Sequence, residues 1–304
     1  CYSNNGEPLT EAGKETFSDE FELLQTADSA VVLLTDSSGA SIIISPAYQA
    51  RIMTSTTGGP DGTGNGWINR ELIRSGVIQP HMNAVGGEER FWLGPEGGQF
   101  GLYFKPGVEF TFDNWQVPAE LDTEPFQVLE KNDHEATFGR DMDLQNHSGT
   151  KFNLRVRRTI RLLNRKTVNG LLGITIRDTM PMVAFESDNL VINTGSNAWK
   201  KESGLLSVWI LSMLNATREG IIGIPYVKGD QTDLGQTVTD DYFGKVPAER
   251  LVITDSMILF RADGNYRSKI GLSPQRSTDR MFGYDPQTGD LTIALFTAPR
   301  PEAG

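Results

Sequence analysis

The strictest constraint on the fold is an alternating stretch in the middle of the chain, Lys151 to Leu163 (KFNLRVRRTIRLL). Apart from Arg158, the even positions are apolar: Phe152, Leu154, Val156, Ile160 and Leu162. Odd-numbered arginines fall on the opposite face: Arg155, Arg157 and Arg161. A period of two over this length predicts a half-buried antiparallel strand. We interpret the arginine face as solvated rather than as an anion site, because the chain has excess acid to offset it.

Short apolar stretches between turn residues predict further strands at 30–34, 41–45, 50–54, 137–145, 170–177, 189–193, 205–211, 251–253, 257–261 and 291–296. One short helix is expected over 16–26, with Ser18 as its N-cap. Strands do not alternate with long helices, which disfavours a parallel α/β sheet. The sequence therefore predicts an all-β fold, a large antiparallel β-sandwich forming a single domain over 16–304 behind a flexible leader, 1–15.

The charge balance bears on which partners are plausible. The chain has 28 basic and 39 acidic residues and a formal net charge of −11, which disfavours binding to nucleic acid phosphates. No run of 18 apolar residues occurs. The three histidines lie far apart, without the short spacings of zinc sites, and no phosphate-binding glycine loop is present. We therefore expect no metal and no cofactor.

Cysteine occurs once, as residue 1, so no disulfide within the chain is expected. The start Cys-Tyr-Ser-Asn-Asn resembles a mature bacterial lipoprotein, in which the N-terminal cysteine carries the lipid. The resemblance implies lipidation of Cys1, a membrane partner, and a place in the bacterial cell envelope, on a periplasm-facing outer membrane. The alternative is an arbitrary start of the chain.

Residues 86–98 (GGEERFWLGPEGG) are rich in groups that bind sugars. Carboxylates, a guanidinium and aromatic rings lie between two glycine pairs: Glu88, Glu89, Glu96, Arg90, Phe91 and Trp92. An aromatic face beside such groups can stack on a sugar ring and hydrogen-bond its hydroxyls. The alternative is a strand between two turns, with Trp92 in the core.

Further candidates lie close by. Residues 57–66 hold five glycines and a proline, which predicts a long mobile loop, and Asn69 and Arg70 close it with several hydrogen-bond donors. A surface ion pair of Arg70 with Glu71 is the alternative. His81 is either a catalytic acid–base group or a solvated loop residue. Lys269 is either a solvated edge residue or a pocket cation.

Several segments together resemble the galactose mutarotase-like superfamily. They are VLLTDSSGASIIISPAYQARIMTS (32–55), Asn69-Arg70, His81 with Gly86-Gly87, and GGEERFWLGPE (86–96). The resemblance implies a β supersandwich and a sugar-isomerising activity like that of the aldose 1-epimerases. Two departures stand out: 205–211 lacks the family's general-acid histidine, and Ser273 stands where a general-base glutamate is expected.

The function hypothesis is a carbohydrate-binding envelope lipoprotein whose cleft is lined by Asn69, Arg70, Arg90, Trp92 and Lys269. If it is a sugar epimerase, the non-standard acid–base pair is His81 and Glu96. The alternative is a non-catalytic glycan-binding or structural subunit of a polysaccharide-uptake system.

Overall fold

The computed structural model describes residues 15–297. Cys1, the expected lipidation site, and nearly all of the expected leader lie outside the described residues. The chain divides into two compact units, and the single domain expected over 16–304 stays a prediction. The described residues 15–215 form what we call the N-terminal unit, and 216–297 form the C-terminal unit.

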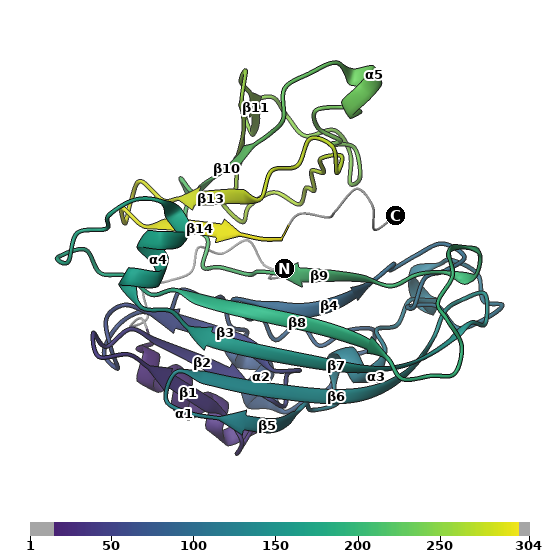
Figure 1. Cartoon of the computed structure of the whole chain (residues 1–304), viewed down its shortest axis with the longest axis horizontal. Coiled ribbons are helices and arrows are strands. Elements are labelled where there is room, and N and C mark those ends of the chain that lie inside the picture. Colours follow the sequence, from purple (N-terminus) through teal and green to yellow (C-terminus); the bar gives the residue numbers. More distant parts are fainter. Residues whose placement is uncertain (1–14, 298–304) are drawn as a thin grey trace. The chain divides into compact units, whose positions relative to one another are not determined.

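The strands of the N-terminal unit form three antiparallel sheets, two of which are joined by a single bridge (Figure 1). One is a three-stranded meander of β1 (Val32–Thr35), β2 (Ser41–Ser45) and β3 (Arg51–Thr56). A bridge between Ile52 and Glu89 joins it to the paired strands β4 (Arg90–Gly94) and β9 (Ser207–Leu211). The third sheet has the order β5 (Gln127–Lys131), β6 (Glu135–Gln145), β7 (Lys151–Leu162) and β8 (Phe185–Asn193).

The main hydrophobic core contains residues of these sheets. Ile42 and Ile44 of β2 belong to the same buried cluster as Phe152, Leu154 and Val156 of β7. The alternation expected for β7 is confirmed, because its even positions are buried and most of its odd positions are exposed. The predicted all-β sandwich is therefore confirmed.

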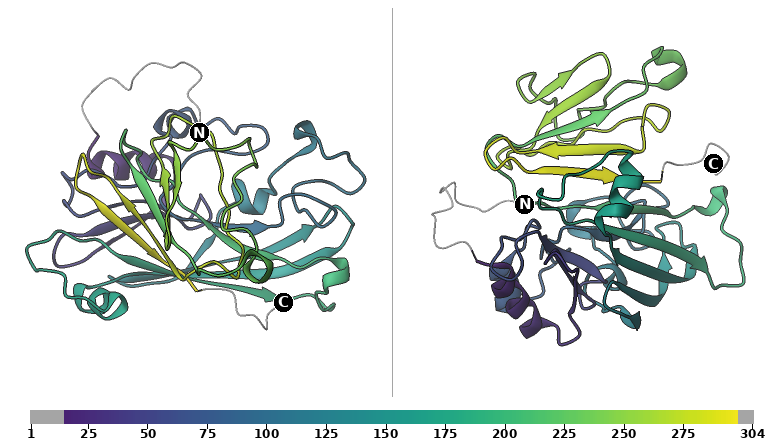
Figure 2. Two further views of the ribbon diagram at one scale, coloured as in Figure 1. Left: turned by 90° about the horizontal axis from the view of Figure 1, so that it is seen from above. Right: turned by 60° about the vertical axis from the view of Figure 1, so that its left-hand side comes forward.

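Two helices cover the outer face of the β1–β3 sheet (Figure 2): α1 (Phe17–Ala27) and α2 (Arg70–Ser75). The predicted helix exists, but its N-cap is Thr16 and not Ser18. Thr16 forms a capping box with Asp19. The Thr16 hydroxyl accepts a hydrogen bond from the Asp19 N–H, and the Asp19 carboxylate accepts one from the Thr16 N–H. Ser18 could not serve, because it lies inside the first turn.

The expected strand at 170–177 is wrong. Helix α4 (Arg165–Leu172) occupies its first three residues, with Asn164 as N-cap and Gly173 ending the helix in the left-handed conformation at φ +68°. The apolar residues Leu171 and Leu172 suggested a strand, but the cap at each end fixes a short helix. The remaining short helical turns of this unit are η1 (Phe112–Asn114), α3 (Ala119–Asp122) and η2 (Lys201–Ser203).

The glycine loop, 57–66, is fastened more firmly than its composition suggests. Backbone N–H groups of Phe17 and Ser18 donate to the carbonyls of Gly62 and Pro60. The Asn215 amide donates to the Gly64 carbonyl at 2.9 Å. The loop therefore serves the start of α1, whose first N–H groups need acceptors.

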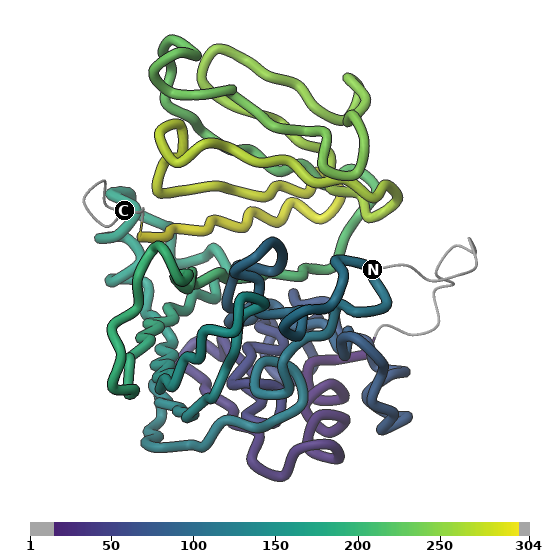
Figure 3. The backbone as a smooth tube through the Cα atoms, turned by 90° about the vertical axis from the view of Figure 1, so that its right-hand side faces the viewer, coloured from purple at the N-terminus to yellow at the C-terminus, as the bar shows by residue number. Residues whose placement is uncertain are grey.

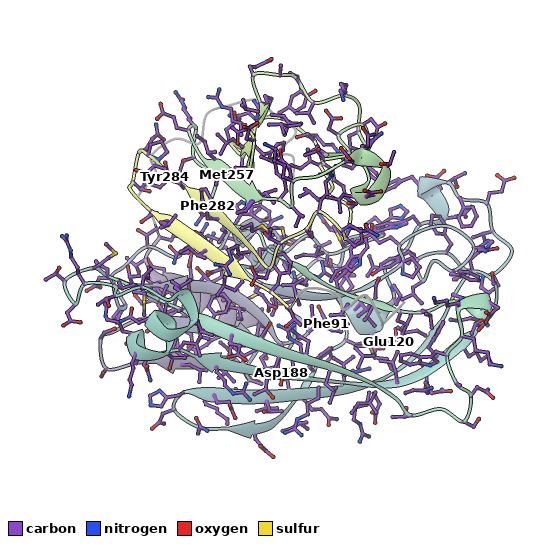
Figure 4. All side chains as sticks on the ribbon, turned by 45° about the horizontal axis from the view of Figure 1, so that its top comes forward. Phe91, Glu120, Asp188, Met257, Phe282 and Tyr284 are labelled. Atoms are coloured by element: carbon purple, nitrogen blue, oxygen red, sulfur yellow. The ribbon has the colours of Figure 1, made fainter. Side chains whose placement is uncertain are left out.

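The C-terminal unit is an antiparallel sheet of five strands in the order β11-β12-β10-β13-β14, and Figure 3 shows the paired course of its last two strands. The strands are β10 (Ile221–Pro225), β11 (Leu251–Ile253), β12 (Met257–Arg261), β13 (Arg280–Tyr284) and β14 (Leu291–Leu295), and one short helix is α5 (Gln231–Leu234). Phe282, labelled in Figure 4, lies against Gly223, where a β-carbon would meet its ring. In 15–297 no helix has the length and apolar character needed to cross a bilayer.

Candidate functional site

The stretch Gly86-Gly87-Glu88-Glu89-Arg90 lies at the entry to β4. Both glycines have positive φ, +89° and +117°. A β-carbon on Gly86 would strike the backbone of Trp67, and one on Gly87 would strike the Arg51 side chain. Only glycine allows this close approach. The three charged residues that follow are all buried, and each contacts a different part of the unit.

Glu89 points toward the opposite sheet. Its carboxylate forms an ion pair with Arg158 of β7, which is fully buried, and accepts a hydrogen bond from the Ser187 hydroxyl at 2.8 Å. Arg158 also donates to Asn189 of β8 at 2.7 Å. A charged side chain on the apolar face of β7 is therefore matched by a carboxylate from the facing sheet, as buried charges require.

Glu88 contacts β3 instead. Its Oε1 accepts from the Ser55 hydroxyl at 2.8 Å, and the exposed Asn65 of the glycine loop donates to the same hydroxyl at 2.9 Å. Its Oε2 is buried without a hydrogen-bond partner. Burial raises the pKa of Glu88 to about 7, against the opposing effect of the Ser55 hydrogen bonds. This carboxyl can therefore gain or lose a proton near neutral pH.

Arg90 and Arg51 complete what we call the interior charge cluster, which consists of Glu88, Glu89, Arg51, Arg90, Arg158 and Asp122. Arg90 donates to the Asp122 carboxylate of α3 at 3.1 Å. Arg51 is fully buried and donates to the Gly86 carbonyl at 2.5 Å and to Gln49 at 3.2 Å. Burial, with the nearby Arg90 guanidinium, holds the pKa of Arg51 well below its usual range.

A series of stacked aromatic rings, which we call the aromatic ladder, connects β4 to the surface. Its rings are Trp92, Tyr103, Trp115 and Phe112, with successive centroids 5.3, 5.6 and 6.2 Å apart and interplanar angles of 26°, 10° and 12°. Trp92 and Tyr103 are only 1% exposed, whereas Phe112 is 70% exposed. The ladder therefore presents a packed aromatic face to solvent at one end.

Phe112 and Phe110, two residues apart in the sequence, each pack on a histidine ring. Phe110 is 53% exposed and packs on His147, with centroids 4.4 Å apart. Phe112 packs on His81 at 4.6 Å. We call this surface the aromatic platform and define it as Phe110, Phe112, Trp115, His81 and His147. Exposed aromatic groups of this size mark binding surfaces more often than chance patches.

His81 is held in an unusual backbone conformation, with φ +68°. Gln116 fixes it by accepting from its N–H and donating to its carbonyl, at 3.1 and 3.0 Å. Its Nδ1 lies 2.6 Å from the Trp115 carbonyl. Because a carbonyl only accepts, Nδ1 carries the hydrogen, and Nε2 is the nitrogen left for a ligand.

The structure brings Arg90, Trp92 and Glu96 together. The Arg90 guanidinium lies 4.0 Å from the Trp92 ring centre, and the Trp92 indole N–H donates to Glu96 at 2.9 Å. The Trp92 ring stacks on Tyr103 and is buried, so neither of its faces is open to a ligand. His81 contacts the other end of the ladder, so two rings separate it from the Trp92–Glu96 pair. The pairing of His81 with Glu96 stays a prediction.

Asn69 and Arg70 lie in another part of the N-terminal unit. Asn69 caps α2 by accepting from the Leu72 N–H at 3.2 Å and donates to the Ala84 carbonyl. Arg70 forms ion pairs with Glu15 and with the buried Glu20, rather than with Glu71. Burial raises the pKa of Glu20, while Arg70 acts against that rise. Both predicted residues thus have contacts that organise the helices.

Lys269 belongs to the C-terminal unit. Its ammonium nitrogen lies 4.5 Å from the ring centre of Tyr242. Its expected place in one cleft with Arg70 and Trp92 stays a prediction.

The sequence analysis did not predict that Phe110 and Phe112 are exposed, or that Arg158 is buried and paired with Glu89. The signal for Arg158 is the break it makes in the apolar face of 152–162. The signal for Phe110 and Phe112 is weaker: two phenylalanines alternate with polar residues in a segment, FTFDNW, bounded by no apolar stretch. The exposure of these rings can be recognised only when the positions of the surrounding strands are known.

Hollows in the described surface do not coincide with these residues. One, of about 560 Å³, is lined by Glu15, Asp19, Glu22, Leu23, Thr26 and Arg74, and another, of about 340 Å³, by Asp36, Ser37, Ser38, Asn164, Arg165, Lys166 and Met182. Within 15–297, no three histidine, cysteine or acidic residues are grouped as metal ligands would be. Among the features described, the aromatic platform presents exposed rings to a ligand.

Comparison with known proteins places the chain in one family. Residues 15–304 match the family of unknown function DUF6786. The chain belongs to this family. No curated protein and no solved structure matches it.

Proposed function

We propose that this DUF6786 member binds carbohydrate, and that the aromatic platform of the N-terminal unit is the binding surface. The observation that carries the proposal is the 70% exposed ring of Phe112, held in a stack that continues into the core. A ring fixed in this way loses little entropy when a sugar stacks on it. The all-β sandwich is compatible with the galactose mutarotase-like relationship, which we retain as part of this proposal.

Polar groups suited to sugar hydroxyls lie on the same segment as the platform. Asp113 and Asn114 are exposed neighbours of Phe112 in the sequence, and His81 presents Nε2. The Asp113 carboxylate, the Asn114 Oδ1 and the His81 Nε2 offer acceptors at the edge of an aromatic face, while the Asn114 amide nitrogen donates to Glu109 and Thr111. A sugar ring needs this combination, because one face is apolar and its rim is lined by hydroxyls.

Binding without catalysis is the better-supported form of the proposal. Acid–base catalysis needs two groups within hydrogen-bond reach of one substrate. His81 lies at the exposed end of the ladder, while Glu96 is bonded to Trp92 at its buried end. A sugar isomerase using this pair remains the second form of the hypothesis.

Saturation-transfer NMR against a panel of monosaccharides and short oligosaccharides tests the proposal. We expect transfer from the wild-type protein to at least one sugar, and a loss of about tenfold or more in affinity for Phe112→Ala. Leu171→Ala, which removes an exposed side chain from α4, is the matched control and should bind normally. The proposal fails if no sugar shows transfer, or if Phe112→Ala binds as well as the control.

A further inference from the structure

A second cluster of exposed rings lies in the C-terminal unit, and cations accompany each of them. A backbone bridge between Thr239 and Gly271 brings the segments 240–245 and 266–270 side by side. We call the result the cation–aromatic patch and define it by its members: Tyr242, Phe243, Tyr266, Arg267 and Lys269.

Contacts within the patch are specific. The Arg267 guanidinium lies 4.2 Å from the ring centre of Phe243, and the Lys269 ammonium 4.5 Å from that of Tyr242. The two rings meet edge to face, with centroids 4.7 Å apart. Arg250 lies 5.0 Å from the Tyr266 ring at the border of the patch. Contacts of this kind hold rings and cations in a fixed arrangement.

All five members are exposed, and the three rings remain 64%, 46% and 43% exposed at Tyr242, Phe243 and Tyr266. The cations therefore leave much of each ring in contact with solvent. Exposed aromatic rings are costly to leave in water, since they gain by burial against a ligand. The patch is thus an aromatic surface with positive charge built into it.

Arg267 differs from its neighbours in its electrostatic surroundings. Most cations of this unit pair with carboxylates, as Lys228 does with Asp255, Lys245 with Asp240, and both Arg250 and Arg261 with Asp263. Arg267 forms no salt bridge with a carboxylate in the described chain. In a chain of net charge −11, a cation kept from acidic partners and placed on a ring is available to a ligand's anion.

We propose that the cation–aromatic patch binds saccharides that carry carboxylate groups, such as uronic acid units. The rings would stack on the sugar face, and Arg267 and Lys269 would bind the carboxylate. Nucleic acid fits less well, because binding its phosphate backbone needs a longer row of cations than the two that the patch holds. This inference concerns a site separate from the aromatic platform and does not depend on it.

Isothermal titration calorimetry of the full chain with a galacturonic acid tetramer, and with its methyl ester, tests the inference. We expect the acid to bind at least about tenfold more tightly than the ester, and its affinity to fall as salt is added. The double variant Arg267→Ala/Lys269→Ala should lose about tenfold or more in affinity for the acid. The control Lys228→Ala/Arg280→Ala removes two exposed charges of the same unit and should bind like wild type.

Three results would overturn the inference: no binding of the acid, equal binding of acid and ester, or equal losses in the patch variant and its charge control. Phe112→Ala separates the two proposals, because it should leave acid binding intact. If Phe112→Ala abolishes acid binding and the patch variant does not, the acidic sugar binds at the platform and the patch proposal is wrong. Circular dichroism checks that each variant is folded.

Discussion

The interior charge cluster and the aromatic platform of the N-terminal unit reverse the usual distribution of side chains. Charged groups such as Glu89 and Arg158 lie in the core of the sandwich, while Phe110 and Phe112 are exposed. Burial of a charge costs several kcal/mol unless it is paired, and exposure of a large ring forgoes about 1.5–3 kcal/mol. The comparison shows that this chain tolerates both the free-energy cost of buried charges and that of exposed rings.

For Arg158 and Arg90 in the interior, the cost is offset by carboxylate partners. Arg158 has Glu89 and Asn189, and Arg90 has Asp122 and the Leu121 carbonyl. At the platform, Phe112 packs on the rings of His81 and Trp115 but stays 70% exposed. We infer that the cluster acts in holding the sheets together, whereas the platform contributes little to folding. Three substitutions test this division.

Arg158→Met should have the largest effect. It leaves Glu89 buried and unpaired, so we expect a loss of about 3–5 kcal/mol in the free energy of unfolding. Urea denaturation followed by fluorescence measures it. Arg155→Met on the same strand is the control, because Arg155 and its partner Asp141 are more than half exposed, and it should unfold almost like wild type. Similar losses in both would contradict a special role for the buried pair.

Glu88→Gln should change how stability depends on pH. The pKa of Glu88 is raised in the folded state to about 7 from an ordinary 4.5, so the folded protein binds the proton more tightly. Its contribution to stability is therefore greatest below pH 4.5 and is lost as pH rises to about 7. The glutamine variant cannot ionise, and at pH 8 it should be more stable than wild type by about 3 kcal/mol.

Thermal unfolding of Glu88→Gln between pH 4 and 8 gives the measurement. The exposed Glu130→Gln variant on β5 serves as the control, since it should keep the wild-type pH dependence. An unchanged pH profile in Glu88→Gln would show that folding does not shift the pKa of this carboxyl.

Phe112→Ala should have the smallest effect on folding. Its ring is mostly exposed, so we expect a change within about 0.5 kcal/mol in the free energy of unfolding. Trp92→Ala, at the buried end of the same ladder, should cost about 3–5 kcal/mol. Chemical denaturation of the two variants compares their losses in the free energy of unfolding. Equal losses would mean that the ladder folds as one unit and that the platform is part of the core.

Local pattern alone predicted much of the fold. The period of two located β7, and strands β2, β11 and β12 fall at the expected residues, because each is a short apolar stretch between turn residues. The hydrophobic pattern gave a wrong prediction at α4. There the caps formed by Asn164 and Gly173 favour a helix, although Leu171 and Leu172 between them suggested a strand. Caps act through hydrogen bonds to backbone groups, which hydrophobic periodicity does not register.

The candidate site was less predictable, for a physical reason. The composition of 86–98 suggested Arg90 and Trp92 as site residues, but it could not show that both are buried, because burial depends on which strands pack over them. Phe112 and His81 lie 31 residues apart in the numbering, and only the loop between β4 and α3 brings their rings into contact. Side chains joined by long-range contacts cannot be grouped from one sequence.

The aromatic ladder also has an optical consequence. Trp115 is half-buried and stacks on the exposed Phe112, so its emission should respond when a ligand binds to that ring. Trp92, which lies two rings deeper in the ladder, would serve as an internal reference, because ligand binding should leave its fluorescence intensity unchanged. Replacing the other three indoles, Trp67, Trp199 and Trp209, with phenylalanine would turn the protein into its own fluorescent sensor.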